Sequence, residues 1–245
     1  MKTEIRDYFN HYIDVIDGGG GSGAEFELPV FELMPRDFVR FAENDLSEEM
    51  TDYQLVNATS NLKRAMDCNL DYLLSVLNLD TLYRTKRLGV DRKLGFFKHA
   101  GVFNGRSLEK LNKFRNRLEH HYEIPDVKDV DVYFDLIAAF VTIGESFISQ
   151  IKSMSDVELF VVIDDSKALL VKSEIMLEQP AILLQLEQPS GEPLVFEVNL
   201  HASNKPSVEY ILEFAYLLKL HTLLIHLFHG SVTKKRFLDE LSIEI

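Results

Sequence analysis

The chain has 245 residues, 46% of them hydrophobic, and a formal net charge of −13. This length allows one large or two small domains with an ample core, and the hydrophobic content is ordinary for a soluble globular protein. The single cysteine, Cys68, excludes an internal disulfide, and we expect it to be a small core side chain. The charges in residues 1–7 exclude the apolar stretch of a signal peptide there, so we expect a cytoplasmic protein.

The N-terminal part combines a helical pattern with a glycine-rich run. Residues 1–16 have apolar side chains at helical spacing, and the sequence predicts a helix there. Gly18 to Gly23, interrupted by one serine, has the composition of a flexible linker, which we extend over residues 17–34.

The segment 35–155 is predicted to be a helical domain. Pro35 can begin a helix, because the backbone N–H that proline lacks would have no partner in the first turn. Further helical patterns cover residues 47–77, 88–98, 107–124 and 130–151. On the last of these helices we expect a stripe facing the core, formed by Val132, Leu136, Phe140, Ile143 and Phe147.

After Ser155 the apolar period changes from that of helices to that of strands. Four strands are predicted over residues 157–200, and Pro206 then begins a long apolar helix that reaches Phe228. Charged side chains within this helix would be costly in a bilayer, so we expect a core or dimer-interface helix and no membrane partner. Residues 156–245 are therefore predicted to form a small antiparallel β-meander packed by one long helix.

No metal or cofactor is predicted from the spacing of candidate ligands. Three histidines, at positions 221, 226 and 229, have no carboxylate or thiolate at ligand spacing. Residues 156–245 also have no glycine-rich phosphate loop and no nucleophile elbow, so we expect a binding or oligomerisation module there.

The segment 113–122 gathers the side chains needed to cleave a phosphodiester without a metal. The imidazole of His120 can exchange a proton near neutral pH, and the guanidinium of Arg115 fits phosphate oxygens in a bidentate way. Asn116 can bind the phosphate or orient the imidazole ring. In a helix Arg115 and His120 would point about 140° apart, so we expect a homodimer through this helix, in which each arginine approaches the other copy's histidine.

These residues resemble the signature of a known family. Arg115, followed by Asn116, His120 and Tyr122, is similar to the Arg-x4-His-x-Tyr motif of HEPN domains, and residues 61–68 and 119–125 also resemble HEPN sequences. The resemblance covers about residues 35–155. It implies an all-helical bundle and a metal-independent endoribonuclease that leaves 2′,3′-cyclic phosphate ends. The predicted fold is therefore α+β, with an all-helical HEPN-like bundle followed by the β-meander.

The motif ending in Tyr122 also resembles the toxin of HEPN–nucleotidyltransferase toxin–antitoxin pairs. In those pairs the partner enzyme adenylylates the tyrosine and so silences the toxin. The resemblance implies a toxin–antitoxin or phage-defence setting, a nucleotidyltransferase antitoxin or another protein as partner, and Tyr122 as the modified residue.

Positive charge is concentrated in and before the motif. From Arg84 to Arg117 the chain has eleven lysines and arginines against two acids, a local charge of +9, and the rest of the chain carries −22. A basic stretch of this kind favours contact with an RNA backbone. The residues expected to contact RNA are Lys110, Lys113, Arg117, His121 and Tyr122.

Two other functions fit the same residues. In a non-catalytic HEPN module, Glu119 would neutralise Arg115 and the acidic chain would bind a protein partner. In a nucleotide-binding module, Arg115 and His120 would hold a phosphate. His121 fits the broader form of the motif, so it could exchange roles with His120.

Overall fold

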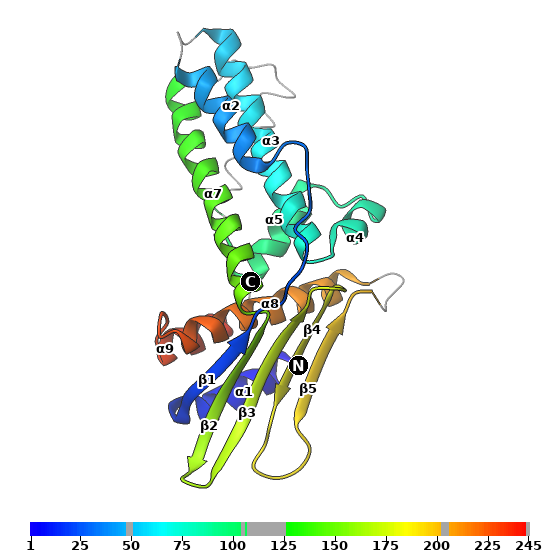
Figure 1. Ribbon diagram of the computed structural model, residues 1–245, viewed down its shortest axis with the longest axis vertical. Coiled ribbons are helices and arrows are strands. Elements are labelled where there is room, and N and C mark those ends of the chain that lie inside the picture. The colour runs from blue at the N-terminus through cyan, green and yellow to red at the C-terminus, as the bar shows by residue number, and fades with distance from the viewer. Residues whose placement is uncertain (48–50, 104–105, 107–125, 202–205, 244–245) are drawn as a thin grey trace. The chain divides into compact units, whose positions relative to one another are not determined.

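The structure is a computed structural model, and it describes residues 1–47, 51–103, 106, 126–201 and 206–243. The chain divides into a sheet unit, formed by Met1–Phe26 and Gln150–Ile245, and a helical unit, Glu27–Ser149 (Figure 1). The class is α+β, but the predicted order of a helical bundle followed by a complete β-meander is wrong. One strand of the sheet precedes the helical unit in the sequence, so the helical unit is an insertion within the sheet unit.

The sheet has five antiparallel strands in the order β1-β2-β3-β4-β5. The four strands predicted after Ser155 are present, and the additional strand lies in the glycine-rich run. The strands are β1 (Ile16–Ser22), β2 (Asp156–Asp164), β3 (Lys167–Met176), β4 (Ala181–Leu186) and β5 (Leu194–Asn199).

Residues 17–22, predicted to be part of a flexible linker, are therefore strand residues. Gly19 pairs with Leu159 of β2, and Gly21 pairs with Val157. A Cβ atom on Gly19 would lie 2.4 Å from the carbonyl oxygen of Glu158, and the φ of Gly19 is +153°. Glycine is required here because the two backbones approach closely, which composition alone does not distinguish from flexibility.

One face of the sheet packs on helices of the same unit. The long helix α8 (Val208–Phe228) contacts β1 to β5, and most of its side chains are buried, as predicted for a core helix. The helix α1 (Lys2–Tyr12) continues into the short 3-10 turn η1 (Ile13–Val15). It packs on a second helix, α9 (Lys234–Ser242), and the sequence analysis did not predict α9. Phe9 of α1 meets Phe237 of α9 with ring centroids 5.0 Å apart.

The helical unit contains the helices predicted before residue 100 and after residue 126, with one short addition, α4. The described helices are α2 (Pro35–Ser47), α3 (Asp52–Val76), α4 (Asp80–Thr85), α5 (Val90–His99) and α7 (Val127–Ser153), whose last residues belong to the sheet unit. By length and composition α7 and α8 could each cross a bilayer, and among the described residues no other helix meets this test.

The core-facing stripe predicted on α7 is partly wrong. Phe140 and Phe147 are buried, and so is Ile137, which was not assigned to the stripe, but Val132 is 66% exposed and Ile143 is 45% exposed. Because α7 is apolar around much of its circumference, its sequence period does not show which side faces α3 and α5. The predicted stripe mixed residues from two different faces of the helix.

Candidate functional site

All the residues predicted to act on RNA lie outside the described residues, within the segment 107–125. They are Lys110, Lys113, Arg115, Asn116, Arg117, His120, His121 and Tyr122. The structure describes the frame on both sides of this segment, which is α5 with the turn to Phe103 before it and α7 after it.

Aromatic side chains pack the turn after α5 against α7. The rings of Phe97 and Phe103 lie 5.8 Å apart, and the rings of Phe103 and Phe140 lie 4.3 Å apart. All three side chains are buried. The chain that leads into the segment 107–125 is therefore held against α7, the helix that follows the segment.

A buried amide joins α3 to α7 in the helical unit. Asn69 is 1% exposed, and its Nδ2 donates to the carbonyl oxygen of Phe140 at 3.3 Å. A Cβ atom on Gly144 would lie 2.6 Å from Oδ1 of Asn69, so glycine at position 144 allows this approach. Since an unpaired buried amide costs about 1–3 kcal/mol, the pairing of Asn69 fixes the register of the two helices.

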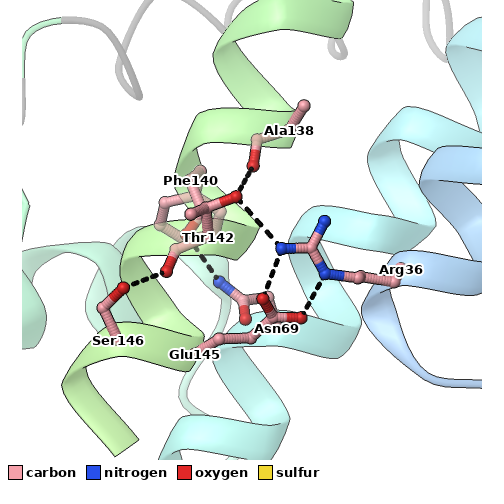
Figure 2. Close-up of polar contacts among 7 residues, drawn as sticks. All are labelled: Arg36, Asn69, Ala138, Phe140, Thr142, Glu145 and Ser146. Carbon is pink, nitrogen blue, oxygen red and sulfur yellow. Dashed lines mark hydrogen bonds and ion pairs between the residues drawn. The ribbon is translucent and has the colours of Figure 1, made fainter. Parts of the chain in front are cut away.

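Beside the amide, an ion pair joins α2 to α7 (Figure 2). Nε and Nη2 of Arg36 donate to the two carboxylate oxygens of Glu145 at 2.6 and 2.5 Å, and Nη2 also donates to Thr142 at 3.3 Å. The pair is exposed, so its contribution to stability is at most about 1 kcal/mol. Glu145 already engages this guanidinium in a bidentate way, which makes Arg36 a positioning residue and a poor phosphate ligand.

The described part of the basic stretch presents several exposed arginines. Arg84, Arg87 and Arg92 are exposed, and so is Arg106 next to the segment that carries the motif. Lys93, by contrast, is paired with Asp71 of α3. Among the described residues of this stretch, the exposed cations that could contact a polyanion therefore include Arg84, Arg87 and Arg92.

Arg87 is held in a backbone conformation that L-residues seldom adopt. Its φ is +52°, and α4 ends there with bonds from Arg87 N to Arg84 O at 3.1 Å and from Leu88 N to Tyr83 O at 2.9 Å. The same type of ending follows α3 at Asn78 and α5 at Gly101, with φ of +55° and +69°. Glycine and asparagine are the usual residues in such endings, so Arg87 carries backbone strain on the order of 1 kcal/mol.

The sheet unit contains a serine–histidine pair that the sequence did not predict. Oγ of Ser173 on β3 lies 2.9 Å from Nδ1 of His221 on α8, and Nε2 of His221 lies 2.9 Å from the carbonyl oxygen of Met154. Both side chains are buried, and burial lowers the pKa of His221 to about 4. The neutral ring therefore donates from Nε2 to Met154 and accepts the Ser173 hydroxyl at Nδ1. Its position inside the core makes this pair structural.

Because His221 is buried, we expect the free energy of unfolding to fall in mild acid. Because its pKa is lower in the folded than in the unfolded chain, the unfolded state binds the extra proton between pH 6.5 and about 4. The free energy of unfolding should fall over this range by up to about 3 kcal/mol from this group alone. Urea unfolding of the wild type and of His221→Gln, from pH 7 to 4, measures it. The variant lacks this imidazole and should show a shallower fall. Parallel curves would contradict the assignment.

The remaining polar features of the described residues do not form a reaction centre. Burial and nearby aspartates raise the pKa of Cys68 to about 11, and its Sγ lies 3.6 Å from the carbonyl oxygen of Leu33, so the thiol is unreactive. A hollow of about 590 Å³ in the sheet unit is lined by residues 22–26, 155–156 and 174–179. Within the described part of the chain, no three histidine, cysteine or acidic side chains are placed to hold a metal ion.

Comparisons of the chain with protein-family models, with curated proteins and with solved structures give no match. The likeness to HEPN domains therefore rests on the Arg-x4-His-x-Tyr motif and on residues 61–68 and 119–125.

Proposed function

We propose that the chain is a metal-independent endoribonuclease of the HEPN type. The observation that carries the proposal is the spacing of Arg115, Asn116, His120 and Tyr122 in the segment between α5 and α7. An imidazole that titrates near neutral pH and a permanently charged guanidinium supply the two functions that the reaction needs. Phe103, before the segment, packs on Phe97 of α5 and on Phe140 of α7, after the segment.

The chemistry is an internal attack within the RNA. His120 takes the proton of a ribose 2′-OH, the 2′-oxygen bonds to phosphorus, and the bond from phosphorus to the 5′-oxygen breaks. The leaving 5′-oxygen takes a proton from the protonated imidazole or from water, so the products are a 2′,3′-cyclic phosphate and a 5′-hydroxyl. Arg115 neutralises the charge that grows on the phosphate oxygens, and Asn116 binds the same phosphate or orients the imidazole. His121 is the alternative general base, and Lys110, Lys113, Arg117 and Tyr122 are the proposed RNA contacts.

The exposed arginines support RNA as the substrate. A chain with a net charge of −13 is repelled by a polyanion overall, so contact requires a local positive surface. Arg84, Arg87 and Arg92 are exposed in the helical unit, which also carries the motif. We place the activity in the cytoplasm, in a toxin–antitoxin or phage-defence setting, with adenylylation of Tyr122 by a nucleotidyltransferase as the means of silencing it.

The reaction products test the proposal directly. Purified protein is incubated with total RNA in EDTA, and the new 3′ ends are analysed by mass spectrometry. We expect cleavage that EDTA leaves intact and ends that carry 2′,3′-cyclic phosphate. The absence of cleavage, in protein whose mass excludes a modified Tyr122, would favour the non-catalytic module. If a nucleotide stabilises the protein against unfolding and RNA does not bind, the nucleotide-binding module would be favoured.

Replacing Arg87 by glycine should change stability and RNA affinity in opposite directions. Glycine relieves the strain at φ +52°, so the free energy of unfolding should rise by about 0.5–1 kcal/mol. The loss of one phosphate contact should reduce the slope of log affinity against log salt by about 0.7–0.9. Urea unfolding and fluorescence anisotropy over a salt series measure the two effects.

Asn78→Gly is the matched control for this change, because Asn78 has the same backbone conformation without a charge. It should be neutral or slightly stabilising, and RNA affinity should stay unchanged. An Arg87→Gly protein that binds RNA with the wild-type salt slope would remove Arg87 from the RNA surface.

A further inference from the structure

An apolar row on α7 is left exposed in the helical unit. Val132 is 66% exposed and Ile143 is 45% exposed, Ala139 is exposed as well, and Leu136 is half-buried. The four residues follow one another at intervals of four, three and four, so they lie along one side of the helix. This alternation of four and three is the spacing of the core positions of a helix in a two-stranded coiled coil. We call the four residues the α7 seam.

We propose that the α7 seam is the contact between two copies of this chain, packed antiparallel about a twofold axis. The axis would pass between Ile137 and Ala138, midway along the seam. Val132 of one copy would then meet Ile143 of the other, and Leu136 would meet Ala139. Each larger side chain faces a smaller one, so the seam is complementary to itself, as a twofold interface requires.

Charge selects the antiparallel over the parallel arrangement. The first part of α7 carries Asp129, Asp131 and Asp135 against Lys128, all of them exposed. Parallel copies would bring these acidic ends together, and like charges placed side by side repel. Antiparallel copies set each acidic end beside the partner's Thr142 and Ser146, which are neutral.

The side chains beside the seam are compatible with loss of water. Thr142 donates to the carbonyl oxygen of Ala138 at 2.9 Å, and Ser146 donates to that of Thr142 at 2.8 Å. Their hydroxyl protons therefore keep a partner within α7 when water leaves. Glu145, the nearest acid in this half, is held by Arg36.

The size of the seam sets the expected affinity. Four side chains cover less than the roughly 800 Å² per partner of a standard interface, so we expect dissociation constants in the micromolar range. The sequence assigned the dimer contact to the segment that carries the motif. That segment lies outside the described residues, and the seam is a separate contact on α7. The inference uses no catalytic residue, so it can fail while the nuclease proposal stands.

The oligomeric state of the intact chain tests the seam. Sedimentation velocity from 1 to 100 µM, without RNA, should show a monomer–dimer equilibrium in the wild type. Val132→Glu combined with Ile143→Glu should raise the dissociation constant at least tenfold. Val195→Glu on β5 is the matched control, because Val195 is 54% exposed and lies off the seam, and it should leave the equilibrium unchanged.

Cross-linking tests the antiparallel register in a Cys68→Ser background. Proteins with Val132→Cys and with Ile143→Cys should form a disulfide-linked dimer when they are mixed and oxidised, and neither should do so alone. Self-linking of the Val132→Cys protein would contradict the register. A monomer throughout, with position 132 protected from thiol reagents, would overturn the dimer and assign the seam to residues 107–125 of the same chain. Binding of the monomer to lipid vesicles, lost in the double glutamate variant, would assign it to a membrane surface.

Discussion

Replacing His120 by alanine should slow RNA cleavage by a factor on the order of 10²–10⁴, because a positioned proton acceptor contributes about that much to such a reaction. RNA binding should fall little, since affinity comes mainly from charges on phosphates. Arg115→Ala should slow cleavage to a similar extent by removing the charge that balances the phosphorane. Arg115→Lys keeps one charge but loses bidentate contact, so it should restore activity only in part. Single-turnover cleavage of a labelled RNA in EDTA gives these rates.

Mixing the Arg115→Ala and His120→Ala proteins tests whether one active site takes residues from both copies of a dimer. If each site takes Arg115 from one copy and His120 from the other, a mixed dimer contains one intact site. About half of the dimers in an equal mixture are mixed, so about a quarter of the wild-type activity should return. No recovery in mixed dimers would place both side chains of a site in one chain. Equal cleavage by the wild type and both variants would remove the nuclease proposal.

His121→Ala is the control for the identity of the base. This variant should keep most of the activity if His120 is the general base. A loss confined to His121→Ala would exchange the roles of the two imidazoles, with the mechanism otherwise unchanged.

Replacing Gly19 by alanine should destabilise the sheet unit by about 2–4 kcal/mol, in the range of substitutions that force a steric clash and backbone strain. A methyl group at this position would lie 2.4 Å from the Glu158 carbonyl oxygen and 2.9 Å from Cδ2 of Leu159. Neither β1 nor β2 can move away without losing the pairing of Gly19 with Leu159. The midpoint of urea unfolding, followed by circular dichroism, measures the change.

The same glycine run supplies the control. Gly20 has no atom within 4 Å of an added Cβ, so Gly20→Ala should be close to neutral. A flexible linker would tolerate both substitutions equally. Equal unfolding midpoints for the two variants and the wild type would therefore contradict the inclusion of β1 in the sheet.

The sequence determined features that depend on neighbours along the chain. Apolar spacing located α3, α5 and α8, and alternation located β2 to β5, because a helix or strand turns its side chains with a fixed local period. The residues proposed to cleave RNA were likewise identified by their chemical type and spacing. Their arrangement was not, since they lie outside the described residues.

The tertiary structure decided what depends on contacts between distant segments. Gly19 is a strand residue because it pairs with Leu159. Arg36 is neutralised by its ion pair with Glu145. Ser173 and His221 are hydrogen-bonded inside the core. The exposed side of α7 belongs to the same group, because α7 is apolar on several sides and only its packing shows which of them is buried. A local period reports which residues share a face, and only the partners in the folded chain determine what that face meets.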